Sequence, residues 1–276
     1  MSEHVTLTLR GGLDGALEVE GVAGDRFAAL SQGEIAALPV WLGARTARLG
    51  DFFDVTGERS STIRVVGPVD DVARVNGLGA GMSAGELTID GDAGARVGAR
   101  MTGGRVDVLG NAGDDAGMAM AGGVLKVRGR AGDRLGAAAP GASKGMTGGE
   151  IVVAGSAGAD AGARARRGLI VVGGDAGRDA ARATIAGTLV VFGRTGPDPG
   201  RASKRGSIIA LGAIVPPATY WYACTYQPPH VRLTLTYLRR QYGFAVDARI
   251  LDGRYRRYCG DSGTPGRGEI LELVAS

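Results

Sequence analysis

Glycine recurs along the middle of the chain at a nearly constant interval. The interval is 19 residues, with one exception of 26, and its glycines are Gly85, Gly104, Gly123, Gly149, Gly168, Gly187 and Gly206. A second glycine follows six residues after each of these. A fixed repeat near 20 residues is typical of a solenoid, in which each repeat folds as one unit and stacks on its neighbours.

Each pair of glycines encloses a short segment with two apolar positions that alternate with other residues. Alternating side chains of a strand point to opposite faces, so these two positions share one face. The pairs are Leu87 and Ile89, Val106 and Val108, Leu125 and Val127, Ile151 and Val153, Ile170 and Val172, Leu189 and Val191, and Ile208 and Ala210. Stacked repeats would join these pairs into a continuous core.

Nineteen residues are too few for a strand and a full crossover helix. The simplest closed path is strand, corner, strand, corner. The pattern therefore predicts a mainly β fold, a single-stranded right-handed parallel β-helix of about seven 19-residue coils.

The regular spacing divides the chain into three predicted parts. Residues 1–60 lack the repeat and form an N-terminal cap, with a capping box at Ser31 and Glu34 that starts a short helix. Residues 61–215 form the parallel β-helix. Residues 216–276 form a C-terminal extension with a helix over 231–242, stopped by Gly243, and two strands around a turn near the end. Leu233, Tyr237 and Arg240 share one face of that helix.

Composition argues against several classes of function. A formal net charge of +4 over 276 residues is too small to indicate nucleic-acid binding. No run of about 20 apolar residues predicts a membrane span. The N-terminus has no basic-then-apolar signal segment, so we expect a cytoplasmic protein.

The sequence shows no catalytic or metal-binding motif. His4 and His230 belong to no metal-ligand spacing, and Cys224 and Cys259 form no CxxC pair. We therefore expect no catalytic residue, no metal site and no cofactor on this chain. Acidic residues such as Asp107, Asp114 and Asp115 would suit a carbohydrate-active β-helix enzyme, but their positions do not repeat from coil to coil, which favours solvated surface charge.

One outward face of the later coils is apolar. Its residues are Val152, Leu169, Val171, Val190 and Ile209. Stacked β-branched side chains are not expected to remain in water. Either the C-terminal segment of the chain or another subunit should cover them.

Basic residues cluster at the corners of the same coils. They are Arg164, Arg166, Arg167, Arg182, Arg201, Lys204 and Arg205, and we expect stacking to gather them on one edge. This edge is either a solvated corner or a contact surface for an anion or an acidic partner.

The 26-residue unit carries an insertion between Ala137 and Gly145. It is either a tolerated surface loop or a contact loop for a partner, since insertions in repeats often decorate one face.

Two repeat units carry a resemblance to a known family. The segments 101–113 and 146–155 resemble the repeat of the glutamate synthase C-terminal β-helix, which also occurs in the family of formylmethanofuran dehydrogenase C subunits. Chain length, the block 49–53 and the end 255–261 favour the C-subunit family, and within it the bacterial formyltransferase/hydrolase type.

That resemblance implies a function. Such a complex moves a formyl group between tetrahydromethanopterin and a methanofuran-type carrier and releases formate. The resemblance implies a non-catalytic structural role for this chain, with amidohydrolase-like, formyltransferase and dehydrogenase-B-like chains as partners, and with zinc and the carrier on those other subunits. The alternatives are the C subunit of an archaeal-type formylmethanofuran dehydrogenase, a glutamate-synthase-related β-helix subunit and, more distantly, a carbohydrate-active enzyme.

Overall fold

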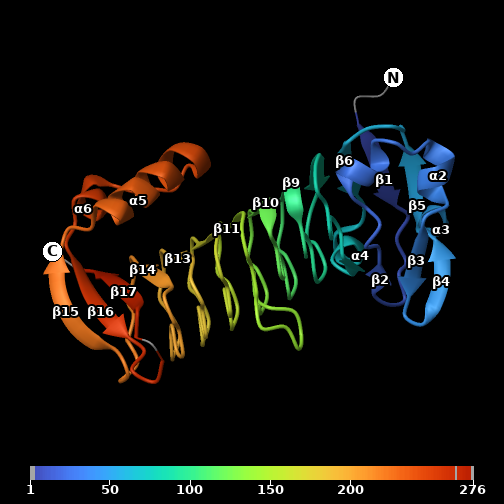
Figure 1. The fold of residues 1–276 in the computed structure, drawn as a ribbon. Coiled ribbons are helices and arrows are strands. Elements are labelled where there is room, and N and C mark those ends of the chain that lie inside the picture. Colours follow the sequence, from blue (N-terminus) through green and yellow to red (C-terminus); the bar gives the residue numbers. More distant parts are fainter. Residues whose placement is uncertain (1–3, 265, 275–276) are drawn as a thin grey trace.

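A computed structural model of the protein describes residues 4–264 and 266–274. The chain is mainly β and is dominated by a 13-stranded, mostly parallel sheet that runs along an elongated stack (Figure 1). The strands contributed by the repeat region are β6 (Thr62–Val66), β8 (Glu86–Ile89), β9 (Thr102–Val108), β10 (Gly122–Val127), β11 (Glu150–Val153), β12 (Leu169–Val172), β13 (Thr188–Val191) and β14 (Ser207–Ala210).

The two ends of the chain form the two ends of the stack (Figure 1). The N-terminal elements are β1 (Val5–Leu9), β2 (Leu17–Glu18), α1 (Gly24–Phe27), α2 (Gln32–Ala36), β3 (Pro39–Leu42), β4 (Arg45–Arg48), α3 (Leu49–Phe52), β5 (Phe53–Thr56), α4 (Val69–Val72) and β7 (Val75–Asn76). The C-terminal elements are β15 (Trp221–Tyr226), α5 (Pro229–Tyr242), α6 (Ala248–Leu251), β16 (Tyr255–Gly260) and β17 (Gly268–Leu273).

Neighbouring repeats pair in parallel and in register. Leu125 of β10 lies opposite Ile151 of β11, which lies opposite Ile170 of β12. Each inward position therefore stacks on its equivalent in the next coil. The fourteen side chains predicted to face inward are at most 3% exposed, which confirms the predicted alternation and its core face.

The two glycines of the unit that begins at Gly104 show why glycine is required at these positions. Gly104, at the start of a strand, has φ of 73°, a conformation that side chains rarely adopt. Gly110, six residues later, lies against the coil below: a Cβ atom there would come within 2.5 Å of the carbonyl carbon of Gly91. At Gly104 the positive φ adds to a close approach, 2.8 Å from a Cβ atom to the Gly85 carbonyl oxygen, whereas at Gly110 close backbone stacking is the reason for glycine.

The second side of each coil is less regular than the sequence predicts. The simplest closed path includes a second strand, but the described coils pair here only through isolated single-residue bridges. The bridges run from Ala93 through Ala112, Ala131, Ala157 and Ala176 to Thr195. The chain enters a turn soon after each bridge, at the left-handed residue three positions later, for example Asp115 after Ala112. This leaves too short an extended segment to form a strand.

Segments from both termini extend the large sheet. β1 pairs in parallel with β6, and β5 then pairs antiparallel with β1. At the other end β17 pairs in parallel with β14, and β16 and β15 follow in antiparallel orientation. All three predicted parts thus contribute to one sheet, and the boundaries near residues 60 and 215 stay predictions.

The local signals at the helix ends act as the sequence predicts. The Ser31 side chain accepts a hydrogen bond from the Glu34 amide, and the Glu34 carboxylate accepts one from the Ser31 amide, which completes the capping box. Gly243 ends α5 in the left-handed conformation, with φ of 74°. None of the helices in the described part of the chain has the length and apolar character needed to span a membrane.

The buried face gives a direct test of the inward register. Val108 is 0% exposed, so Val108→Asp should bury an unpaired carboxylate and prevent folding into the native stack. Lys126→Asp, at an outward and partly exposed position of the next strand, is the matched control and should fold. Circular dichroism and thermal melts measure both, and an unchanged melting temperature for Val108→Asp would show that the inward register is wrong.

Candidate interaction surfaces

Helix α5 lies across the outward face of the later coils (Figure 1). Val152, Val171, Val190 and Ile209 are at most 2% exposed and belong to one buried cluster with residues of the C-terminal segment. That cluster includes Val231, Leu235 and Leu238 of α5 and Leu271 of β17, with Leu169 partly buried at its border. Within the chain itself, the C-terminal segment covers the apolar face.

Helix α5 packs on the coils through a different face from the one that Leu233, Tyr237 and Arg240 share. Leu233 is 72% exposed and Tyr237 is 40% exposed, whereas Leu235 and Leu238 are fully buried. Both faces carry apolar residues at helical spacing, so periodicity alone could not decide between them. The apolar face of the coils determines which face of α5 is buried, because Leu235 and Leu238 pack against it.

A carboxylate on the stack anchors this helix near its C-terminal end. Both Tyr237 and Tyr242 donate hydrogen bonds to Glu150, Tyr237 at 2.8 Å to Oε1. Burial, and then the hydrogen bond to Glu150, raise the pKa of both tyrosines. The repeat pattern did not predict this cluster. The one signal for it was that Glu150 stands at a strand position where the next coils have Leu169, Thr188 and Ser207.

The C-terminal turn is tied to the stack by a buried acid. Asp261 is 5% exposed, and its carboxylate accepts hydrogen bonds from the amides of Ala202, at 2.8 Å, and Gly263, at 2.9 Å. Burial opposes the charged form, but these amide donors prevail and lower the pKa of Asp261. The final hairpin is thereby fixed to the last coil.

The seven predicted basic residues divide into two groups. Arg182 pairs with Asp160 and Arg201 pairs with Asp179, each at 2.7 Å. Arg164 donates to the carbonyl of Ala142, in the insertion, at 2.8 Å. Three of the seven side chains thus have partners inside the chain. For the two ion pairs, the left-handed corner of one coil places an aspartate beside the arginine of the next.

The other four basic residues remain exposed. They are Arg166, Arg167, Lys204 and Arg205, and none has a side-chain hydrogen bond or ion pair within residues 4–264 and 266–274. Arg166 and Lys204 are separated by 38 residues, as are Arg167 and Arg205, so each pair occupies one coil position two coils apart. At about 4.8 Å per strand, the backbones of each pair lie roughly 10 Å apart.

The insertion closes one side of a shallow hollow. Pro140 and Gly141 line it together with Arg134, Arg164 and Arg182, and its volume is about 170 Å³. Arg134 is already paired with Asp115 at 2.8 Å. Arg182 likewise has an acidic partner inside the chain, so little unpaired positive charge faces the hollow.

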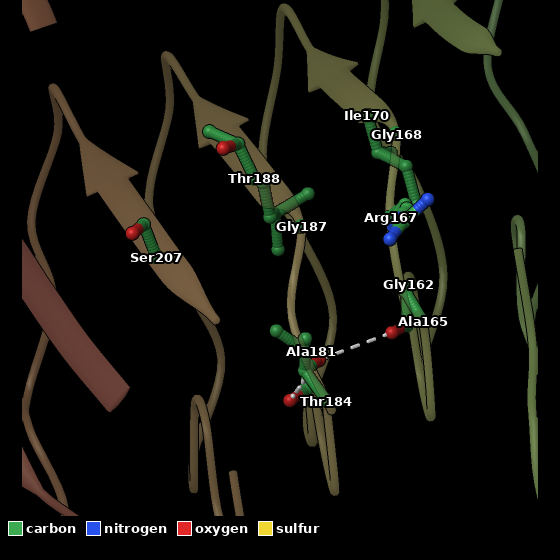
Figure 2. A pocket seen from close by; sticks show the side chains of 11 residues that line it. Gly162, Ala165, Arg167, Gly168, Ile170, Ala181, Thr184, Gly187, Thr188 and Ser207 are labelled. Atoms are coloured by element: carbon green, nitrogen blue, oxygen red, sulfur yellow. Dashed lines mark hydrogen bonds between the residues drawn. The ribbon is translucent and has the colours of Figure 1, made fainter. Parts of the chain in front are cut away.

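Residues of three later coils line a narrow void (Figure 2). Gly162, Ala165 and Ile170 contribute to its lining, and its volume is about 10 Å³, which is room for a single water molecule. The Thr184 hydroxyl beside it donates to the Ala181 carbonyl at 2.7 Å. This void is a packing gap and has no room for a substrate.

The candidate acidic groove does not gather acids alone. Asp107 pairs with Arg105 at 2.6 Å, while Asp114 and Asp115 both face Arg134. In the part of the chain that the structure describes, no three His, Cys, Asp or Glu side chains stand together as metal ligands. These three carboxylates serve in ion pairs with neighbouring arginines.

A solved structure shares this architecture along nearly the whole chain. The protein is similar to one chain in the crystal structure of the formyltransferase/hydrolase complex FhcABCD from Methylorubrum extorquens with methylofuran. The TM-score is 0.88 and the identity 35%, covering 98% of this chain and 100% of that one. No model of a known protein family matches the chain.

Two curated relatives share shorter stretches. The C subunit of the molybdenum-containing formylmethanofuran dehydrogenase 1 from Methanosarcina barkeri is 39% identical over 99 residues, which is 34% of this chain and 32% of the relative. The C subunit of the formyltransferase/hydrolase complex Fhc from Methylorubrum extorquens is 36% identical over 92 residues, which is 33% of this chain and 34% of the relative. The matched stretch thus spans about a third of these curated relatives.

The stacked parallel sheet and the glycine repeat define a β-helix-like subunit. The chain belongs to the family that contains the C subunits of formylmethanofuran dehydrogenase and of the Fhc complex. The resemblance found in the sequence is thereby confirmed.

The covering helix can be tested by truncating its buried face. Leu235→Ala removes a fully buried side chain from the cluster over β11 to β14, and should lower the free energy of unfolding by about 2–5 kcal/mol. Leu233→Ala, on the exposed face of the same helix, is the matched control and should change it by less than about 0.5 kcal/mol. Equal effects of the two variants in denaturant titrations would contradict this packing.

Proposed function

We propose that this chain is a non-catalytic structural subunit of a formyltransferase/hydrolase complex. The complex would move a formyl group between tetrahydromethanopterin and a methanofuran-type carrier and release formate. The observation that carries the proposal is the structural match to a chain of the FhcABCD complex over 98% of this chain at 35% identity. We further infer that the stack is a right-handed parallel β-helix of about seven coils.

A structural role also accounts for how the chain uses its side chains. The inward residues fill the core, and the outward valines are used to hold α5. Charged corner residues such as Arg182 and Arg201 bind the adjacent coil. In this proposal zinc and the carrier belong to the amidohydrolase-like, formyltransferase and dehydrogenase-B-like partners, all in the cytoplasm.

A second candidate function is the equivalent scaffold of a formylmethanofuran dehydrogenase. It is favoured by the 39% identity to the C subunit of the molybdenum-containing enzyme of Methanosarcina barkeri over 99 residues. The two candidates share the same scaffold role and differ in the partners. The metal content of a purified complex separates them, because the dehydrogenase candidate predicts molybdenum or tungsten in the complex.

The exposed basic edge is proposed as a contact surface. Arg166, Arg167, Lys204 and Arg205 are free of internal partners among the described residues, so they can bind an external anion without breaking an ion pair. The proposed partner is an acidic surface of a neighbouring subunit or the carrier, if its tail is rich in glutamate. Arginine suits either, because its planar guanidinium binds carboxylates with two parallel hydrogen bonds.

Purification of the tagged chain from its native host tests the assignment. We expect formyltransferase and amidohydrolase-like subunits to co-elute and to be identified by mass spectrometry. The isolated chain should show no formyl transfer and no formyl hydrolysis, whereas the complex should show both. Turnover by the pure chain, with contaminants excluded, would contradict the structural role.

The basic edge is tested by neutralising only its unpaired members. The quadruple variant Arg166→Gln, Arg167→Gln, Lys204→Gln and Arg205→Gln should keep the melting temperature of the chain but weaken assembly of the complex, or raise the carrier concentration that turnover requires. Added salt should mimic this effect in the unmodified complex, because exposed charges are screened over about 8–10 Å.

The paired arginines provide the control for this experiment. Arg182→Gln and Arg201→Gln remove partly exposed ion pairs to the preceding coil, so they should affect assembly less than the quadruple variant and should change stability little. If assembly, carrier dependence and salt sensitivity of the quadruple variant all match the unmodified complex, the edge is solvated and makes no contact.

A further inference from the structure

The two edges of the large sheet are finished in different ways. At the N-terminal edge, helix α2 packs against the edge strand β5, and its Gln32 side chain donates to the Val55 carbonyl at 2.7 Å. At the C-terminal edge, β15 is the last strand (Figure 1). Beyond its ladder with β16, the described residues give the β15 backbone one further hydrogen bond, from Arg254 to the Thr225 carbonyl at 3.0 Å.

The composition of β15 gives this edge little protection. Edge strands are commonly blunted by charged side chains, by proline within the strand, by a covering element or by a bulge. Of these devices, β15 has the irregularity between Tyr222 and Cys224 alone among the described residues. β15 reads Trp-Tyr-Ala-Cys-Thr-Tyr and contains no charge and no proline. Trp221 is 51% exposed and Tyr222 is 56% exposed. A six-residue strand with open backbone groups and exposed aromatic side chains is a template for pairing with another strand.

We propose that β15 binds an extended segment of another subunit, which adds to the sheet as a fourteenth strand. This rests on the proposed function, because it requires partner subunits. The chemistry of the edge specifies the partner segment: about six residues in β conformation, uncharged over its middle, with apolar or aromatic side chains to pack on Trp221 and Tyr222. A charged segment would bury its charge against a strand that offers none in return.

The irregularity in β15 argues against a second copy of this chain as the occupant. The register with β16 shifts between Tyr222 and Cys224, which lies at the middle of the strand. Antiparallel pairing of two identical strands places a two-fold axis near their middle. The two irregular points would then face each other and interrupt the ladder, whereas a different strand can compensate for one.

Amide hydrogen exchange on the assembled complex tests this inference. The co-purified complex and the isolated chain are compared over peptides that span residues 219–228. Assembly should slow exchange at the β15 amides at least tenfold, because added strand hydrogen bonds protect them. Slow exchange in the isolated chain that depends on its own concentration would show self-pairing and overturn the proposal.

A charge variant links the edge to assembly. Cys224 is exposed, so Cys224→Lys should leave the fold intact while placing a charge in the proposed ladder. It should raise the dissociation constant of the chain for its partner subunits at least tenfold. Leu233→Lys, at an exposed position of α5, should not raise this dissociation constant.

The outcomes separate this inference from the proposed function. A complex that forms normally with Cys224→Lys, or with no protection at β15, overturns the strand addition and leaves the family-based assignment standing. If the unmodified chain binds no partner subunits, the assignment falls and the strand addition falls with it.

Discussion

Every part of this structure depends on how closely the backbone of one coil approaches the next. Amides of each coil donate to carbonyls of the coil before it, as Gly110 does to Gly91 at 2.9 Å. That approach tolerates no Cβ atom at the contact positions, so glycine recurs at the repeat interval. Because the backbone bonds set the register, the apolar pairs align and form one core along the stack.

The stack also explains why the outer surface changes character along its length. The first coils carry polar or charged residues at the outward strand position, such as Thr88, Asp107 and Lys126, and α5 does not lie over these strands (Figure 1). The later coils carry valine and isoleucine there and lie under α5. The same side of the stack is thus polar over the first coils and apolar over the later coils. The apolar part determines where the C-terminal segment packs on the stack.

Ion pairs reinforce the corners without making them a site. The residue at the left-handed corner is an aspartate in several coils, and it meets an arginine from the following coil. Such exposed pairs contribute little stability each. Their main consequence, together with the Arg164 contact to the insertion, is to reduce the basic edge from seven candidate cations to four.

Spacing along the chain was enough to predict the coil, its inward face, the helix ends at Ser31 and Gly243, and the resemblance to the C-subunit family. These features are local or strictly periodic, so a one-dimensional pattern reports them. The folded stack was needed to show which face of α5 is buried, which arginines are neutralised, how Glu150 holds Tyr237 and Tyr242, and that β15 leaves an open edge. Each of these depends on which residues, distant in sequence, the fold brings together, and no linear pattern contains that information.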